Sequence, residues 1–168
     1  MERRAAVLSA ILACVAAHAS FARADGADTI SLQAPDGAAL VLAVGPDAPP
    51  LLLHFWATWC PDCAAELPRL DARLAACDGT PVRAYLVNVG EPAAAAQAFL
   101  AARGVRAPLA LDPSGAVWRR LAPQGLPANA FFREGELHRA AGALDADAWA
   151  RRLAALGCRG ASPDEAVR

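Results

Sequence analysis

The sequence predicts one α/β domain over residues 25–160, and three observations support this prediction. The chain has 168 residues, 56% of them hydrophobic, which suffices for a single hydrophobic core. Short apolar runs of strand length alternate with segments of helical spacing. Near the end of the domain, two strand-like runs are joined by Glu134-Gly135, which predicts an antiparallel hairpin at one side of the sheet.

The first half of the domain begins with a predicted hairpin. Residues 29–44 contain two short strand-like runs around the turn sequence Pro-Asp-Gly. The apolar run LLLHFW, residues 51–56, predicts a central strand covered on both faces. A helix is predicted from Pro61 towards Cys77, because proline suits a first helical turn and apolar residues then recur with helical spacing. The next buried strand is expected at residues 82–89.

The second half continues the alternation of helix and strand. The segment 92–103 predicts a helix that starts at Pro92 and stops before Gly104. A short strand at 109–111 and a short helix at 116–121 follow. The late hairpin is expected at residues 129–133 and 136–140, and the last helix at 145–156. Residues 161–168 are interpreted as a loose tail.

Residues 1–24 have the pattern of a secretory signal peptide. Two arginines precede an apolar run at residues 5–17, and Ala22 and Ala24 supply the small residues required for a cut before Asp25. An uncleaved membrane anchor of about 18 residues and a lipoprotein cleavage box ending at Cys14 are the alternatives. Cleavage after Ala24 leaves four of the five cysteines, in a compartment such as the periplasm where disulfides persist.

The charge of the chain gives no reason to expect a nucleic-acid partner. The formal net charge is −1 at pH 7, and the sequence contains no block of basic residues. Proteins that bind nucleic acid depend on a basic surface to neutralise phosphates. We therefore expect no nucleic-acid partner.

Cys60 and Cys63 are separated by Pro61 and Asp62 in the segment HFWATWCPDCAAELP, directly after the strand predicted at 51–56. Cysteines with this spacing at the start of a helix can close a small disulfide ring, and the first thiol then faces the positive end of the helix dipole. That environment stabilises a thiolate, which is the attacking species in disulfide exchange. We expect Cys60 to be the nucleophile and Cys63 to resolve the mixed disulfide, without a cofactor.

A Cys-x-x-Cys pair can also serve purposes other than disulfide exchange. Half of a zinc site is disfavoured, because Cys77 and Cys158 stand singly in the sequence and no second Cys-x-x-Cys pair accompanies them. An inert structural disulfide is disfavoured by the position of the pair between a strand and a helix. A copper chaperone would use both sulfurs with His54 or His138, but the spacing does not require it. No metal site is predicted.

The segment HFWATWCPDCAAELP resembles the active site of the TlpA/ResA group of periplasmic thiol–disulfide oxidoreductases, which belong to the thioredoxin superfamily. The resemblance covers roughly residues 29–156, including the helix-plus-strand segment 92–111, the GLPANAFF segment and the closing hairpin and helix. It implies a thioredoxin fold with an N-terminal β-hairpin and a central helix-plus-strand insertion.

The resemblance also implies where a substrate protein binds. Leu126-Pro127 would be a cis-proline step against the active-site disulfide, and the main chain of Leu126 would dock an extended substrate segment. An ordinary loop proline is the alternative for Pro127. Trp59 would form part of an exposed apolar collar that meets the partner, together with Pro61 and Asp62.

Two carboxylates and a histidine near the cysteines are candidates for tuning them. Asp62 disfavours a second negative charge, which raises the pKa of the thiols and favours reducing power. Glu66 lies where the related reductases carry a glutamate that assists proton transfer, although a solvated helix glutamate is the alternative. His54 replaces an aspartate that cytoplasmic thioredoxins bury beside the resolving cysteine. We interpret His54 as a buried, hydrogen-bonded core residue.

Cys77 and Cys158 are the remaining cysteines of the domain. In a thioredoxin fold the active-site helix and the last helix lie on one face of the sheet and run the same way, so their C-terminal ends approach each other. Cys77 and Cys158 stand at these ends, which predicts a structural disulfide, with two free thiols as the alternative. A Cα separation beyond about 7 Å would count against the pairing.

The sequence therefore predicts a periplasmic or membrane-anchored thiol–disulfide oxidoreductase that reduces disulfides of cysteine-containing proteins through Cys60 and Cys63. The resemblance implies a membrane electron donor of the DsbD/CcdA type, and the direction of transfer rests on the resemblance alone. A dedicated reductant in cytochrome c or copper-centre assembly is one alternative. A copper-binding metallochaperone is the other.

Overall fold

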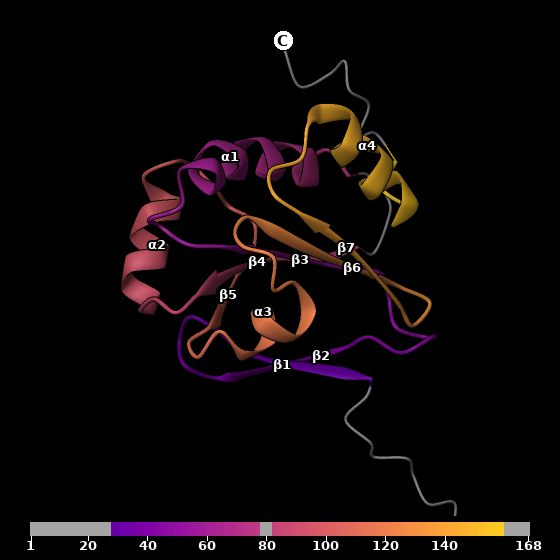
Figure 1. Ribbon diagram of the computed structural model, residues 1–168, viewed down its shortest axis with the longest axis horizontal. Coiled ribbons are helices and arrows are strands. Elements are labelled where there is room, and N and C mark those ends of the chain that lie inside the picture. The colour runs from indigo at the N-terminus through magenta and orange to yellow at the C-terminus, as the bar shows by residue number, and fades with distance from the viewer. Residues whose placement is uncertain (1–27, 78–81, 160–168) are drawn as a thin grey trace, which may run out of the picture.

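The computed structural model describes residues 28–77 and 82–159, which form one mixed sheet with helices on both faces (Figure 1). The predicted signal peptide, with Cys14, and the predicted tail at 161–168 lie outside the described residues. Strands and helices follow one another in the predicted order, and the α/β prediction is confirmed.

The helices and strands have the following bounds: β1 (Thr29–Gln33), β2 (Ala39–Ala43), β3 (Leu51–Trp56), α1 (Pro61–Ala75), β4 (Arg83–Val89), α2 (Ala93–Ala101), β5 (Leu109–Asp112), α3 (Ala116–Leu121), β6 (Ala128–Arg133), β7 (Glu136–Ala141) and α4 (Ala146–Ala155). The bounds of β3 and α3 agree with the predicted residues. Helix α2 is shorter than predicted, because Ala102 already caps it and Gly104, with φ 66°, follows in the left-handed region.

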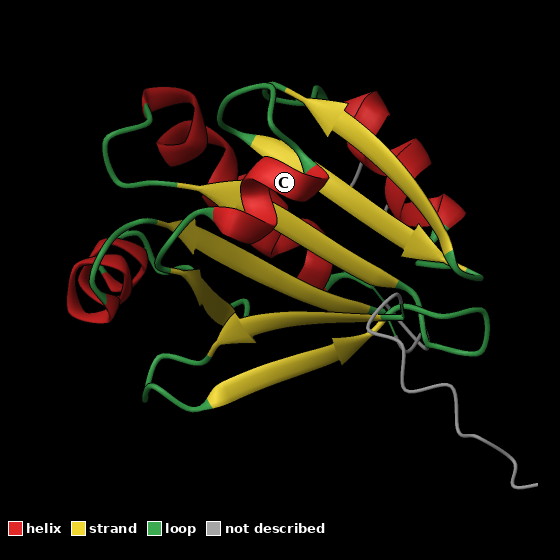
Figure 2. Ribbon diagram, turned by 60° about the horizontal axis from the view of Figure 1, so that its bottom comes forward, coloured by secondary structure: helices red, strands yellow, loops and turns green. Residues whose placement is uncertain are grey.

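The sheet has seven strands in the order β2-β1-β5-β4-β3-β6-β7. Strand β3 is an interior strand that pairs in parallel with β4 and antiparallel with β6, while β4 and β5 are parallel. Both predicted hairpins are present, β1–β2 at one edge and β6–β7 at the other (Figure 2). The interior position of β3 explains why all six of its residues are buried.

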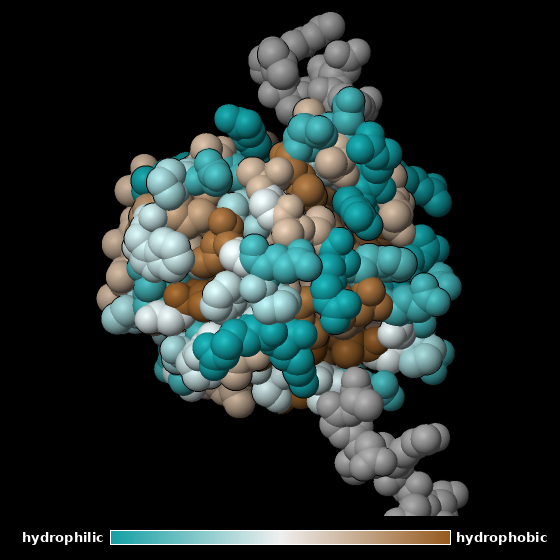
Figure 3. Space-filling view, viewed as in Figure 1, coloured by the Kyte–Doolittle hydropathy of each residue, from teal (hydrophilic) through white to brown (hydrophobic). Residues whose placement is uncertain are grey.

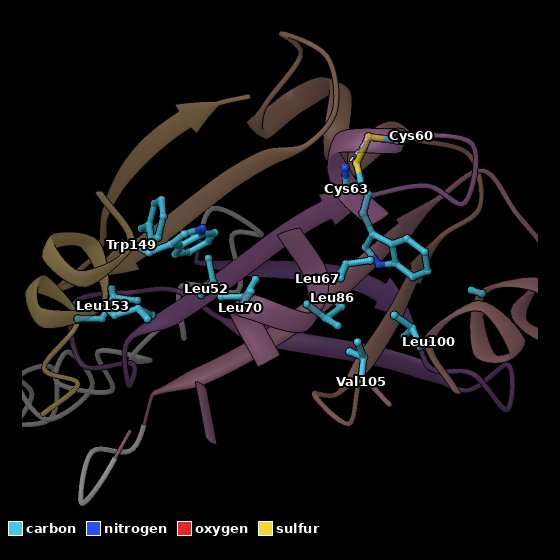
Figure 4. Packing of buried hydrophobic residues seen from close by; sticks show 14 of the residues in the cluster. Leu52, Cys60, Cys63, Leu67, Leu70, Leu86, Leu100, Val105, Trp149 and Leu153 are labelled. Carbon is cyan, nitrogen blue, oxygen red and sulfur yellow. Dashed lines mark hydrogen bonds between the residues drawn. A yellow bond between two sulfur atoms is a disulfide. The ribbon is translucent and has the colours of Figure 1, made fainter. Parts of the chain in front are cut away.

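The two faces of the sheet carry separate apolar clusters. On one face, Leu52 and Trp56 of β3 belong to a cluster with residues of α1, α2 and α4 (Figure 4). On the other face, Leu53 and Phe55 cluster with residues of α3, β1 and β2. The alternation of side chains along a strand explains this division. It also places His54, between Leu53 and Phe55, on the same face as α1 and α4.

The outer surface in the view of Figure 3 is mostly polar, with small separate apolar patches between charged residues. Two large hydrophobic side chains are strongly exposed among the described residues, Val41 at 60% and Trp59 at 69%. Within the described ranges, none of the helices has the length and apolar character needed to cross a membrane.

Candidate redox site at the start of helix α1

Cys60 and Cys63 form a disulfide at the start of α1, with their Cα atoms 5.2 Å apart. Cys60 is the N-cap residue of the helix, Pro61 stands in the first turn, and Sγ of Cys60 accepts a hydrogen bond from the N–H of Cys63 at 3.2 Å. The site follows β3 after a short loop, so this interior strand fixes the position of the cysteine pair. Cys60 is 4% exposed and Cys63 is fully buried.

This geometry suits nucleophilic exchange at Cys60. The N–H groups of the first helical turn and the helix dipole stabilise negative charge on the sulfur at the N-cap. Trp59, Pro61 and Asp62 are exposed around the pair. The cysteine pair therefore lies at the edge of the apolar cluster, next to surface side chains that a second protein could contact, and Figure 4 shows it at the opposite end of the cluster from Trp149.

The Leu126-Pro127 peptide bond is cis. Ala128, the next residue, pairs with Phe55 in the antiparallel register of β3 and β6. Pro127 therefore lies beside the end of β3, where the chain leaves the sheet towards Cys60. Leu126 is half-buried, and the carbonyl of Pro127 accepts a hydrogen bond from the N–H of Gly142 at 2.9 Å.

Glu66 is buried, with 4% exposure, and the solvated alternative is therefore wrong. Its Oε1 accepts hydrogen bonds from the N–H of Leu144 and from Nε1 of Trp149, both at 2.7 Å. Its Oε2 has no partner among the described residues. Burial raises the pKa of Glu66, and the two hydrogen bonds and the nearby Arg69 offset only part of this effect.

A hollow of about 250 Å³ reaches Glu66 from the surface, and Asp62 and Trp149 contribute to its lining. Glu66 therefore borders this hollow, on the side of the helix that also carries Asp62. A carboxyl group in this environment can hold a proton at a higher pH than a solvated glutamate does. Such a group has the properties required to exchange protons with a buried thiol one turn earlier on the helix.

His54 is fully buried, and its Nδ1 lies 2.8 Å from Oδ1 of Asn129 across the β3–β6 pair. Burial lowers the pKa of His54 to about 4, against a smaller opposing effect of the Asn129 hydrogen bond. The histidine is therefore neutral at pH 7. Its ring lies 6.1 Å from the ring of Trp149, and Nε2 has no partner within the described part of the chain.

Cys77 and Cys158 also form a disulfide, with a Cα separation of 5.0 Å. Cys77 lies just beyond the end of α1, and Cys158 just beyond the end of α4. Together with the bonds from Glu66 to Leu144 and Trp149, this disulfide joins α1 to the last part of the chain at two points.

The sequence patterns did not identify Asn129 or Trp149 as neighbours of the site. Asn129 stands among the apolar residues 128–132 of β6, and a buried amide at such a position requires a polar partner. Trp149 carries an N–H that needs an acceptor when it is buried. Both signals indicate that a partner exists without indicating which residue it is.

No cluster of three or more His, Cys, Asp or Glu side chains with the arrangement of a metal site occurs within residues 28–77 and 82–159. The sulfur atoms of Cys60 and Cys63 are bonded to each other in this structure.

The fold and the site together define a thioredoxin-fold protein with a dithiol/disulfide pair at the N-terminus of its first helix. The sequence model of the AhpC/TSA family matches residues 15–134, and the chain belongs to this family.

Among curated proteins, the chain is 39% identical over 112 residues to the thiol:disulfide interchange protein DsbE homolog of Paracoccus denitrificans, covering 61% of this chain and 56% of that protein. It is 36% identical over 62 residues to the thiol-disulfide oxidoreductase ResA of Bacillus subtilis, covering 37% and 35% of the two chains. The matches thus span about half or less of these relatives. They confirm the resemblance to thiol–disulfide oxidoreductases of the ResA type.

Solved structures of similar proteins share the fold. A secreted disulfide oxidoreductase of Mycobacterium tuberculosis, described as homologous to E. coli DsbE, matches with a TM-score of 0.64 and 25% identity over 79% of this chain and 99% of that chain. The dsbF protein of the same organism matches with a TM-score of 0.66 and 27% identity over 79% and 98%. The predicted thioredoxin fold is confirmed by these likenesses.

Proposed function

We propose that this protein is an extracytoplasmic thiol–disulfide oxidoreductase that reduces disulfides of other proteins. The observation that carries the proposal is the Cys60–Cys63 disulfide at the N-cap of α1, with the N–H of Cys63 bonded to Sγ of Cys60 at 3.2 Å. In the reduced enzyme, the thiolate of Cys60 attacks a substrate disulfide and releases one substrate thiol. The thiol of Cys63, after losing its proton, attacks the mixed disulfide, releases the second thiol and leaves the oxidised pair.

The residues around the pair support roles in this cycle. Glu66 is buried one turn beyond Cys63, its Oε2 has no partner among residues 28–77 and 82–159, and it serves as the group that takes the proton from Cys63. The main chain of Leu126, before the cis-proline Pro127, docks an extended segment of the substrate. Trp59, Pro61 and Asp62 provide the exposed contacts beside the cysteines.

The proposal also includes the direction of electron transfer, from this protein to its substrates, and the location of the protein. Asp62 beside the pair disfavours the thiolate and biases the couple towards reduction of substrates. A membrane electron donor of the DsbD/CcdA type returns the pair to the dithiol form. The secretory pattern of residues 1–24 supports a location in the periplasm, with the protein either free after cleavage or held by its N-terminal segment.

Reduction of insulin with dithiothreitol as electron source tests the activity. The wild-type protein accelerates the reaction, and Cys60→Ser abolishes the acceleration. The matched control replaces the other pair, Cys77→Ser with Cys158→Ser, and keeps the activity at temperatures where this variant is folded. Loss of activity in the control and not in Cys60→Ser would contradict the assignment of the site.

The reduction potential of the Cys60/Cys63 couple tests the direction. A reductase is expected near the value of thioredoxin, about −270 mV, whereas a potential near −120 mV would make the protein an oxidant. A narrower form of the proposal, a dedicated reductant in cytochrome c or copper-centre assembly, predicts fast reduction of those apoproteins and slow reduction of insulin. Stoichiometric Cu(I) binding without exchange activity would instead support a metallochaperone.

A further inference from the structure

Glu91, in the loop after β4, accepts three hydrogen bonds near the candidate site. Its Oε2 accepts from the main-chain N–H of Thr58 at 2.8 Å and from Nδ2 of Asn88 at 2.7 Å. Its Oε1 accepts from the hydroxyl of Thr58. A carboxylate is suited to this position because both of its oxygens face donors, whereas an amide would turn an N–H₂ group towards one of them.

Asn88 anchors this arrangement to the sheet. Asn88 is fully buried in β4 and stands opposite Trp56 of β3 in the parallel register. Burial raises the pKa of Glu91, but the hydrogen bonds from Thr58 and Asn88 outweigh that effect and hold the pKa below its ordinary value. Glu91 is therefore an anion at neutral pH, fixed to the sheet through Asn88 and to the loop through Thr58.

Glu91 is hydrogen-bonded to the loop between β3 and α1, which leads into the cysteine pair. Thr58 lies between Trp56, the last residue of β3, and Cys60, the N-cap of α1. The N–H of Cys60 closes a tight turn on the carbonyl of Ala57 at 3.2 Å. Trp59 follows Thr58 directly and is 69% exposed. Fixing both the N–H and the hydroxyl of Thr58 therefore fixes the direction in which Trp59 leaves the loop.

We propose that Glu91 is a positioning residue for partner docking, which holds Thr58 so that Trp59 is presented to an incoming protein beside Cys60. The inference rests on the proposed function, because it concerns the same exchange reaction. A protein substrate needs both the sulfur of Cys60 and the surface around Trp59. A small disulfide needs the sulfur alone.

Assays with a protein substrate and with a small disulfide distinguish a role of Glu91 in partner docking from a purely structural role. Reduced wild-type protein and its Glu91→Gln, Thr58→Val and Thr58→Ser variants are assayed with insulin and with 5,5′-dithiobis(2-nitrobenzoate). Glu91→Gln and Thr58→Val are expected to raise KM for insulin about two- to tenfold, the equivalent of one lost hydrogen bond. The kcat for insulin and the rate with the small disulfide change less than about twofold. Thr58→Ser keeps the hydroxyl donor and retains the wild-type KM.

Asp71→Asn is the matched control. Oδ1 of Asp71 accepts the main-chain N–H groups of Arg106 and Ala107 at 3.0 and 2.7 Å, so it fixes a different loop by the same kind of contact. This variant is expected to lose stability and to keep the KM for insulin. Equal losses with both substrates in Glu91→Gln and Thr58→Val, or an unchanged KM in both, would overturn the inference. If the wild-type protein reduces neither substrate, the proposed function itself fails.

Discussion

The Nε1 N–H of Trp149 donates a 2.7 Å hydrogen bond to Oε1 of Glu66, across 83 positions of sequence. This bond joins the helix that begins at the cysteine pair to the last helix of the domain. Because the same oxygen also accepts the N–H of Leu144, the ionisation of Glu66 depends on how the last helix is placed. The titration of Glu66 is therefore a measurable property that reports on both helices.

Glu66→Gln is expected to lower kcat/KM for insulin reduction near pH 7 on the order of tenfold to a hundredfold, because the variant cannot accept the proton of Cys63. The amide keeps an oxygen for Leu144 and Trp149. A profile of kcat/KM from pH 5 to pH 9 should lose the inflection due to Glu66, which in the wild type lies above the ordinary value of 4.5. Asp62→Asn, which changes an exposed carboxylate on the same helix, should retain an inflection, moved to lower pH because the charge of Asp62 helps to raise the pKa of Glu66. An unchanged profile in Glu66→Gln would remove the residue from the mechanism.

Trp149→Phe should move the same inflection to higher pH. The substitution removes a hydrogen bond that lowers the pKa of Glu66, while burial continues to raise it. Trp56→Phe is the matched control, since Trp56 is also fully buried on this face and its Nε1 has no partner in the described part of the chain. Equal shifts in the two variants would show that packing, and not the hydrogen bond, sets the pKa.

His54 makes the stability of the fold sensitive to mild acid. The unfolded chain binds a proton at this residue below pH 6.5, but the folded protein does so only near pH 4. Between these values the unfolded state binds more protons, so stability decreases as the pH falls, by up to about 3 kcal/mol for this residue. Above pH 6.5 the full contribution is present.

Urea unfolding of wild type and His54→Asn at several pH values between 4 and 8 measures this contribution. The difference in unfolding free energy should shrink as the pH falls below 6.5 and stay constant above it. Glu66 titrates with the opposite sign, because its raised pKa makes the folded state bind more protons, but it is present in both proteins and cancels. A difference that does not vary with pH would refute the role assigned to His54.

The two disulfides should differ in their effect on stability. Cys77 and Cys158 are 81 positions apart, and Cys60 and Cys63 are 3 apart. The chain-entropy relation gives about 4.5 kcal/mol for the long loop and about 2 kcal/mol for the short one. Thermal or urea unfolding of the two double serine variants should rank them in this order. The reverse ranking would mean that the Cys77–Cys158 pair does not brace the fold.

The order of the elements could be predicted from the sequence because each one carries a local signal. The apolar run at residues 51–56 identified β3, and the Cys-Pro-x-Cys segment identified the start of α1. The position of Cys158 could be inferred only through the resemblance to a known fold, because nothing near it in sequence points to Cys77.

The polar contacts around the site could not be predicted in the same way. The His54–Asn129 pair depends on the register of β3 against β6, and a shift of one residue would turn either side chain to the other face. Thr58 and Glu91 meet because the loops after β3 and β4 begin at the carboxyl ends of two neighbouring parallel strands. Periodicity describes the faces of single elements, and it carries no information on how distant elements are aligned.

The Cys77–Cys158 bond closes residues 77–158 into a covalent ring that contains β4 through α4. A protease that cuts an exposed turn inside the ring, such as Glu134-Gly135 between β6 and β7, therefore leaves two pieces that separate only after reduction. Cys60 and Cys63 lie outside this ring. The Cys60–Cys63 disulfide can thus open and close while residues 77–158 stay covalently closed.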